Sequence, residues 1–241
     1  LECVRKTDSI KVLIYVTSDK CYKNKEWIWG YRENDELGGK DPYSASKAAA
    51  ELIFNSYQDS FLSNLENFGY ASVRAGNVIG GGDFSDDRIV PDCIKSILSD
   101  QPIIIRNPHA TRPWQHVLEP LSGYLLLAAK LREDPIFYRG AWNFGPRPGS
   151  AKTVEDVANK LIEKLGKGDL LVENSNKDNV HESNLLQLNC DKANEIINWQ
   201  PKWDFEETLS KVAMWYKHYH EKKDLINFSI QQINDYEEKN D

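Results

Sequence analysis

The chain has 241 residues, of which 40% are hydrophobic and 28% are charged, and its formal net charge is −7. This length allows a sizeable core in one large domain or two small ones, and the composition is that of an ordinary globular protein. The acidic balance argues against broad binding to nucleic acids or anionic membranes, and no apolar stretch is long enough to cross a bilayer.

The cysteines do not form a recognisable site. Cys3, Cys21, Cys93 and Cys190 lie far apart, and no CxxC pair occurs. This spacing predicts neither a zinc site nor a redox pair, and no metal site is expected. Unpaired thiols in a chain of this size are typical of a reducing compartment, so we expect a cytoplasmic protein.

The first predicted elements bring reactive side chains to the end of a strand. After a helix end and a turn over residues 1–11, the apolar run of residues 12–16 is typical of a buried strand. Ser18, Asp19 and Lys20 follow it directly. Catalytic groups of open α/β sheets gather at the carboxyl ends of strands, so this hydroxyl, carboxylate and ammonium are candidates for catalysis.

A helix is predicted over residues 43–62, and it carries a second candidate pair. Tyr43 and Lys47 are four residues apart, so they share one face of a helix. A neighbouring ammonium stabilises a phenolate, which makes the pair a candidate base. Short motifs of this kind are common by chance, and a tyrosine beside an exposed lysine is an ordinary amphipathic pattern; the triplet upstream is what favours catalysis.

The remaining elements alternate between strands and helices. We predict strands over 70–74, 103–106, 114–117, 142–144, 170–172 and 186–188, helices over 87–99, 120–131, 153–165 and 204–222, and a loosely held tail from residue 226. Strands separated by helices indicate an α/β fold with a Rossmann-like parallel sheet, and the short elements of the later half suit a smaller mixed α/β substrate-binding lobe.

These motifs together carry a family resemblance. The Tyr43-x-x-x-Lys47 pair, the Ser18-Asp19-Lys20 triplet and the loop at Asn77 resemble the extended short-chain dehydrogenase/reductase family of nucleotide-sugar enzymes. Within that family, residues 17–22 and 26–34 look like those of CDP-glucose 4,6-dehydratases. The dTDP-glucose relatives usually have Thr-Asp-Glu as the triplet, so Lys20 and the Trp-rich segment indicate the CDP-sugar branch. The resemblance extends from about Ser9 to His220.

One departure concerns the cofactor. The family opens with a Gly-rich dinucleotide fingerprint, which this sequence lacks, and Gly80-Gly81-Gly82 is not a substitute because no helix with the right spacing follows it. We expect the chain to begin in the last third of the Rossmann domain, with on the order of 100 residues missing. Such a chain would hold NAD weakly, because the pyrophosphate has no helix N-terminus to bind.

The resemblance also implies a division of the chain. Residues 1–80 are expected to be the remaining part of the NAD-binding Rossmann domain and to carry the catalytic residues. Residues 81–225 would form mainly the nucleotide-sugar lobe, interleaved with Rossmann elements, and residues 226–241 the tail. Family members are commonly homodimers, and the resemblance implies the same here.

The implied reaction converts CDP-glucose to CDP-4-keto-6-deoxyglucose with transient reduction of bound NAD. Tyr43 would take the proton of the sugar 4-hydroxyl, Asp19 would protonate the departing 6-hydroxyl, and Ser18 would polarise the 4-oxygen. Lys47 would bind the nicotinamide ribose beside Tyr43. Lys20 stands where relatives have a glutamate base; it either removes the C5 proton as a neutral amine or offsets the charge of an enolate.

Three further residues are implied contacts of the substrate. Asn77 would bind the sugar nucleotide, and Arg88 and Arg112 would bind its diphosphate, since a guanidinium suits phosphate oxygens. Taken singly, an asparagine after a strand is typical of a turn and an arginine of a surface salt bridge. Glu182 is a weaker candidate for a ribose contact.

Two other functions remain open. A nucleotide-sugar 4-epimerase, or a dehydratase for another nucleotide sugar, shares the Tyr-x-x-x-Lys pair but does not need Asp19 and Lys20 together. A truncated, non-catalytic module that binds a nucleotide sugar, or nothing, is consistent with the missing Gly-rich turn. Loss of water separates the first alternative from a dehydratase, and catalytic turnover separates the second.

Overall fold

The computed structural model describes residues 1–173 and 186–239, which fold into two compact units. Both units are assembled from stretches that are far apart in the chain. The first comprises Leu1–Gly76, Pro120–Gly145 and Leu186–Gln200, and the second comprises Asn77–Glu119, Pro146–Leu185 and Pro201–Asp241. Each unit is described by itself below.

A three-stranded parallel sheet forms the centre of the first unit. Its strands are β1 (Val12–Val16), β2 (Gly69–Arg74) and β7 (Gly140–Asn143), in the order β1-β2-β7. Val12 pairs with Gly69 at one end of the β1–β2 ladder, and Arg74 pairs with Asn143 at the end of the β2–β7 ladder. All strands run the same way, so their carboxyl ends meet at one edge of the sheet. The expected Rossmann-like parallel α/β sheet is confirmed.

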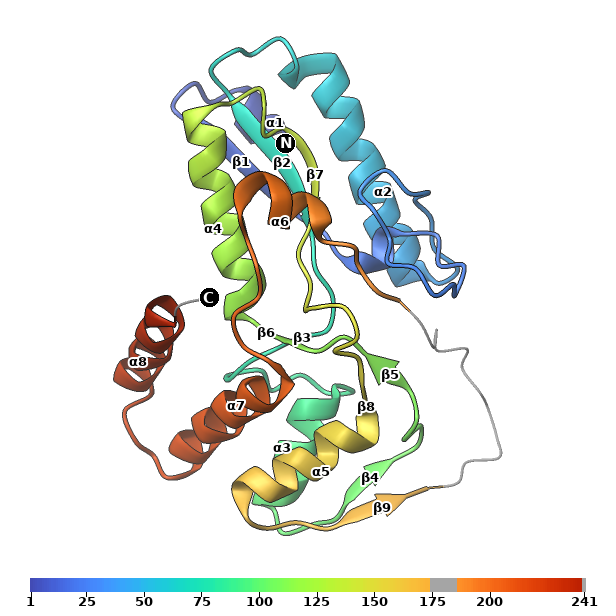
Figure 1. Ribbon diagram of the computed structural model, residues 1–241, viewed down its shortest axis with the longest axis vertical. Coiled ribbons are helices and arrows are strands. Elements are labelled where there is room, and N and C mark those ends of the chain that lie inside the picture. Colours follow the sequence, from blue (N-terminus) through green and yellow to red (C-terminus); the bar gives the residue numbers. More distant parts are fainter. Residues whose placement is uncertain (174–185, 240–241) are drawn as a thin grey trace. The chain divides into compact units, whose positions relative to one another are not determined.

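Helices cover both faces of this sheet. Ala71 and Val73 of β2 pack against α4 (Leu118–Glu133) and α6 (Asp191–Ile197), whereas Tyr70 packs on the other side against Phe54 of α2 (Pro42–Tyr57). Figure 1 shows α2 and α4 on opposite sides of the strands. Successive residues of a strand point to opposite faces, and both faces of β2 are buried.

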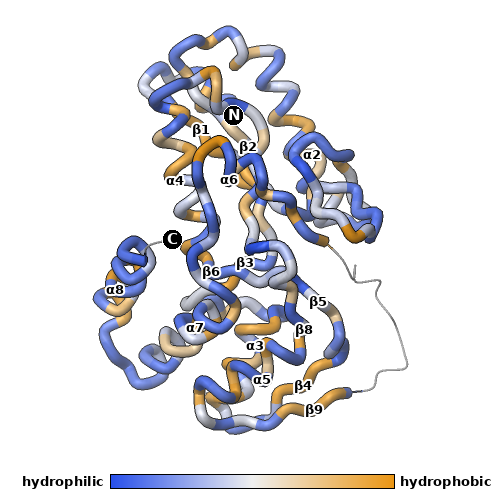
Figure 2. The backbone as a smooth tube through the Cα atoms, in the orientation of Figure 1, coloured by the Kyte–Doolittle hydropathy of each residue, from blue (hydrophilic) through white to orange (hydrophobic). Residues whose placement is uncertain are grey.

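The second unit is built around packed helices. Apolar residues at helical spacing on α3 (Ile89–Leu98), α5 (Val154–Leu165) and α7 (Phe205–His220) share one core, which includes Ile97, Leu161 and Leu209. Its strands form short pairs: β3 (Val78–Ile79) with β6 (Gln115–His116), β4 (Ile103–Ile105) with β9 (Leu170–Val172), and β5 (Thr111–Arg112) with β8 (Lys152–Thr153). Of these, β4 and β9 are hydrophobic along their length (Figure 2).

Three elements differ from those predicted. The helix expected over 43–62 ends at Tyr57, and a π-helical turn, η2 (Gln58–Leu62), replaces its last part. The strand expected over 186–188 is wrong: this segment makes only an isolated bridge between Tyr31 and Leu188. The prediction of a loosely held tail is also wrong for the described residues, which form α8 (Leu225–Glu238). The Asp224 side chain caps the first turn of this helix. The spacing of its apolar residues did not indicate what the helix packs against.

Helix α8 packs on its own unit through polar contacts. The Tyr236 hydroxyl donates to the buried Glu119 carboxylate at 2.6 Å, and the Trp215 indole of α7 donates to Ser229 at 3.0 Å. Glu119 also accepts from the backbone amides of Lys202 and Trp203. Within the described ranges, no helix is both long and apolar enough to cross a membrane.

Candidate active site

The site begins where β1 ends. The chain continues beside β2 for three more residues, since the Thr17 amide donates to the Val73 carbonyl at 2.9 Å and the Asp19 amide donates to the Ala75 carbonyl at 3.1 Å. A short 3-10 turn, η1 (Asp19–Cys21), follows. The sheet therefore places the predicted triplet at the carboxyl end of its strands, where the sequence motif put it.

The triplet is tied together by its own hydrogen bonds. The Ser18 hydroxyl donates to Asp19 Oδ1 at 2.9 Å and accepts from the Lys20 amide at 3.2 Å. Ser18 thus caps η1 while it also holds the carboxylate. Asp19 is only 3% exposed, whereas Lys20 is half-buried. A carboxyl group held by a hydroxyl at a strand end is geometrically suited to proton transfer.

Gly76 lies directly against the Asp19 carboxylate. A Cβ added at Gly76 would lie 2.0 Å from Asp19 Oδ2. No side chain fits in that space unless the carboxylate moves. Glycine at this position therefore fixes how closely the backbone after β2 approaches Asp19.

We expect Gly76→Ala to lower turnover about tenfold or more, because the Asp19 carboxylate must leave its place to admit the methyl group. Gly145→Ala is the matched control, since its Cβ would meet Cys190 Sγ at an ordinary 3.5 Å. Initial rates and thermal unfolding of both variants check this. Full activity of Gly76→Ala would mean that the position of Asp19 does not matter.

Helix α2 brings the second predicted pair to the same unit. Asp41 caps the helix by accepting from the Ser44 amide at 2.9 Å, and Pro42 occupies its first turn. Hydrogen bonds from Ser44 hold the pKa of Asp41 below its usual range, and the Lys20 ammonium adds to this effect. The start of α2 therefore lies near η1, and the two elements contact each other.

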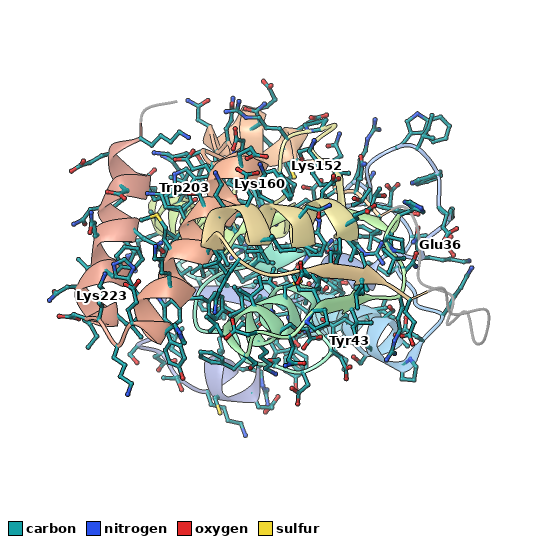
Figure 3. All side chains as sticks on the ribbon, turned by 90° about the horizontal axis from the view of Figure 1, so that it is seen from below. Glu36, Tyr43, Lys152, Lys160, Trp203 and Lys223 are labelled. Atoms are coloured by element: carbon teal, nitrogen blue, oxygen red, sulfur yellow. The ribbon has the colours of Figure 1, made fainter. Side chains whose placement is uncertain are left out.

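Tyr43 and Lys47 share one face of α2, as predicted. The Lys47 ammonium lies 5.8 Å from the centre of the Tyr43 ring. Tyr43 is 56% exposed, on the surface of the unit (Figure 3). Within residues 1–173 and 186–239, its hydroxyl has no hydrogen-bond partner, so it is open to a bound molecule.

Sequence reasoning missed the buried ion pair behind this site. Glu51 of α2 and Arg74 at the end of β2 are both buried and form a salt bridge of 2.9 Å. Burial disfavours the charge on Glu51, but hydrogen bonds from Arg74 outweigh it and hold the pKa of this carboxyl below its usual range. In sequence each residue looks like an ordinary surface charge, so no local pattern indicated the pair.

The predicted substrate residues lie in the second unit. Asn77 has a left-handed backbone with φ of 51°, and its buried amide nitrogen Nδ2 has no partner among the described residues. Arg88 is exposed and lies 3.9 Å from Asp83, and Arg112 donates to the Thr111 carbonyl at 2.8 Å. Glu182 lies outside the described residues.

The glycine run at residues 80–82 has a packing role. A Cβ on Gly81 would lie 2.1 Å from the Trp215 ring, and one on Gly80 would lie 2.8 Å from Val117. These close approaches bring the loop onto α7 and onto Val117, the residue after β6.

Comparison with known proteins assigns the chain to a family. The sequence profile of the family described as GDP-mannose 4,6 dehydratase matches residues 1–212. The chain belongs to this family. It is 46% identical to the CDP-glucose 4,6-dehydratase of Salmonella typhimurium over 98% of its own length and 67% of that protein. It is 23% identical to the human dTDP-D-glucose 4,6-dehydratase, over 86% of this chain and 57% of that protein.

Solved structures show the same fold. The dTDP-glucose 4,6-dehydratase of Bacillus anthracis, in complex with NAD, superposes with a TM-score of 0.74 at 23% identity, over 92% of this chain and 66% of that chain. The UDP-glucose 4-epimerase of Thermotoga maritima has a TM-score of 0.74 at 19% identity, over 90% of this chain and 67% of that chain. The chain thus spans about two thirds of the length of these relatives. Both dehydratases and epimerases have this fold.

Proposed function

We propose that the protein acts as a CDP-glucose 4,6-dehydratase, an NAD-dependent hydro-lyase. One observation carries the proposal: the chain is 46% identical, over nearly all its length, to a dehydratase for this substrate. The placement of Ser18 and Asp19 beside the helix of Tyr43 and Lys47 supports it, because elimination of water needs an acid as well as the base that oxidation needs.

The residues present fit one end of NAD. The exposed Tyr43 hydroxyl and the half-buried Lys47 ammonium, on one face of α2, are a suitable pair for a ribose. Bound NAD would accept and return a hydride, the redox chemistry that the protein's own side chains lack. The contribution of this chain is to hold the sugar and move its protons.

Proton transfer and hydrogen bonding at the sugar are assigned to three side chains. Tyr43 takes the proton of the 4-hydroxyl, since its side chain is exposed and the Lys47 ammonium lies 5.8 Å from the centre of its ring. Ser18 polarises the 4-oxygen by a hydrogen bond, for which its single O–H turns from Asp19 Oδ1 to the sugar. Asp19, which follows Ser18 at the start of η1, protonates the departing 6-hydroxyl.

Lys20 is assigned to the C5 position. Its side chain is half-buried near Asp41 at the start of α2. Either it removes the C5 proton or it offsets the negative charge that develops when another group removes it. Lys20→Met and Lys20→Arg separate the two roles, because arginine keeps the charge but cannot act as a base.

Asn77, Arg88 and Arg112 are assigned to the nucleotide part of the substrate. The buried and unpartnered Nδ2 of Asn77 supports a hydrogen bond to a ligand, since buried donors are seldom left unpaired. The exposed guanidinium of Arg88 and the half-buried one of Arg112 suit a diphosphate.

We expect Asp19→Asn to slow formation of the 4-keto-6-deoxy product by about a hundredfold, because the amide cannot protonate the leaving oxygen. Binding of CDP-glucose should change little, since the amide keeps the size of the carboxylate. Product formation followed by NMR and substrate binding followed by calorimetry check both parts. A normal rate would remove Asp19 from the acid role.

The substrate is tested by supplying NAD with CDP-, dTDP-, UDP- and GDP-glucose in parallel. A 4-keto-6-deoxy product from CDP-glucose alone is the expected result. Product from another nucleotide sugar would change the substrate, and a C4 epimer without loss of water would make the protein an epimerase. Folded protein with no reaction on any of them would favour a non-catalytic nucleotide-sugar module.

The same proposal includes a cytoplasmic homodimer. All four cysteines are free, in keeping with a reducing compartment. Helix α2 also exposes Leu52 and Ile53, apolar side chains that a second copy would cover. Sedimentation velocity of the wild type and of a Leu52→Glu variant tests the dimer.

A further inference from the structure

The proposed reaction needs two parts of the first unit at a fixed separation. Ser18 and Asp19 belong to the turn after β1, whereas Tyr43 and Lys47 belong to α2. The two parts are joined in sequence by an irregular stretch of about twenty residues, which cannot fix their distance by itself. Besides the direct contact between η1 and α2, a buried ion pair connects the two parts.

Glu51 anchors the α2 side. It follows Lys47 by one helical turn on α2, and it is fully buried. Its Oε1 accepts from the Thr17 hydroxyl and from Arg74 Nε at 2.9 Å. Its Oε2 accepts from the Ser72 hydroxyl at 2.9 Å and from Arg74 Nη2 at 2.9 Å. Each carboxylate oxygen therefore accepts two hydrogen bonds, from residues of β2 and from Thr17, which follows β1.

Arg74 extends the network to the far end of the turn. It is 2% exposed, and its Nη1 donates to the Tyr22 hydroxyl at 2.7 Å and to the Glu33 carbonyl at 2.9 Å. The Tyr22 hydroxyl in turn donates to Asn143 Oδ1 of β7 at 2.8 Å. A guanidinium with fixed fork geometry can hold these groups at set directions, which a lysine could not.

The two contacts bracket the catalytic turn. Thr17 immediately precedes Ser18, and Tyr22 immediately follows Cys21. Both ends of the Ser18–Cys21 segment are thus hydrogen-bonded to one buried pair, and that pair includes a residue of the Tyr43 helix.

A contribution to fold stability does not by itself explain why this ion pair is buried here. Burying two charges costs much of what their attraction returns, and apolar replacements of buried ion pairs are often neutral or stabilising. We propose that Glu51 and Arg74 are positioning residues, which act through Thr17 and Tyr22 to hold the Ser18–Asp19 turn in register with Tyr43 and Lys47. This inference rests on the proposed function, which assigns the catalytic roles to the residues that are positioned.

Thr17→Val tests the near end, because it removes one hydroxyl and keeps the side-chain shape. We expect the amides of Asp19, Cys21 and Tyr22, all hydrogen-bonded in the native protein, to exchange with deuterium about tenfold faster. We expect kcat to fall about tenfold while KM stays within about twofold, since a misplaced acid affects the chemical step more than binding. Thr17→Ser should restore both.

Ser72→Ala is the matched control. It also removes one hydroxyl donor to Glu51, but Ser72 lies within β2, where it pairs with Tyr15 of β1. Exchange of the three turn amides and kcat should both remain within about twofold of wild type. Tyr22→Phe repeats the test from the far end and replaces Thr17→Val if that variant does not fold.

Two results would overturn the proposal. One is unchanged exchange of the turn amides in both Thr17→Val and Tyr22→Phe. The other is that amide exchange speeds up equally in Thr17→Val and Ser72→Ala, both in β2 and in the turn. That result is expected if the Glu51–Arg74 pair only stabilises the fold. The exchange measurement needs no substrate. A wild type without dehydratase activity would therefore refute the proposed function, while the exchange data would still show whether Glu51 and Arg74 hold the turn.

Discussion

Tyr43→Phe is expected to lower dehydratase turnover by about a thousandfold, within the range seen when a general base is removed. The change deletes only the hydroxyl, which is open to a ligand, and it leaves the ring beside the Lys47 ammonium. Binding of CDP-glucose should therefore be nearly unchanged. Initial rates and calorimetric titration with the sugar nucleotide measure the two quantities separately.

The control for this variant lies on the same helix. Tyr57 ends α2, and its hydroxyl donates to Glu2 at 2.8 Å on the surface of the unit. Tyr57→Phe removes the same atom at a place without a proposed chemical role, so its turnover should match wild type. Equal rates for Tyr43→Phe and Tyr57→Phe would remove Tyr43 from the reaction.

The parallel sheet was predictable because its signals are local. Apolar runs such as residues 12–16 and 70–74 identify strands by composition, and their separation by helices indicates a parallel arrangement. The helix over residues 225–238 was missed for a reason that lies outside that segment. Its Tyr236 hydroxyl finds Glu119, more than a hundred residues away, and no pattern within the segment reports that contact.

The site was predictable to the same extent. Ser18 and Asp19 follow a strand, and Tyr43 and Lys47 have helical spacing, so short-range patterns suffice to find them. Glu51 and Arg74 each look like an ordinary surface charge in sequence, and only the packing of α2 on β2 makes them partners. The second unit contains the other three candidates, Asn77, Arg88 and Arg112. Their positions in the sequence do not tell how far they lie from the triplet in space.

A second large effect is expected from His116, which is buried in the second unit. The ring is 2% exposed and packs edge-on against Trp203 at 4.7 Å between ring centres. Nδ1 accepts from the Leu118 amide at 3.2 Å, which places the proton of the neutral ring on Nε2. Burial, followed by the charge of Lys211, lowers the pKa of His116 to about 3.

This shift makes the free energy of unfolding depend on pH in a definite direction. In the unfolded chain the imidazole takes up a proton below its ordinary pKa of 6.5, whereas in the folded protein it does not until about pH 3. The unfolded state therefore binds more protons in this window, and stability falls as the pH falls. Between pH 7 and pH 4.5 the contribution of this one residue is about 2.5 kcal/mol.

Urea unfolding of wild type and His116→Gln over this pH range isolates the effect, because every other titrating group is common to both. We expect the stability of the variant to decline by about 2.5 kcal/mol less than that of wild type, since glutamine binds no proton in either state. His220→Gln, at the exposed end of α7, is the control for replacement of a histidine as such. Parallel curves for wild type and His116→Gln would mean that the buried imidazole is protonated with ease, and that the packing of Trp203 does not exclude its charge.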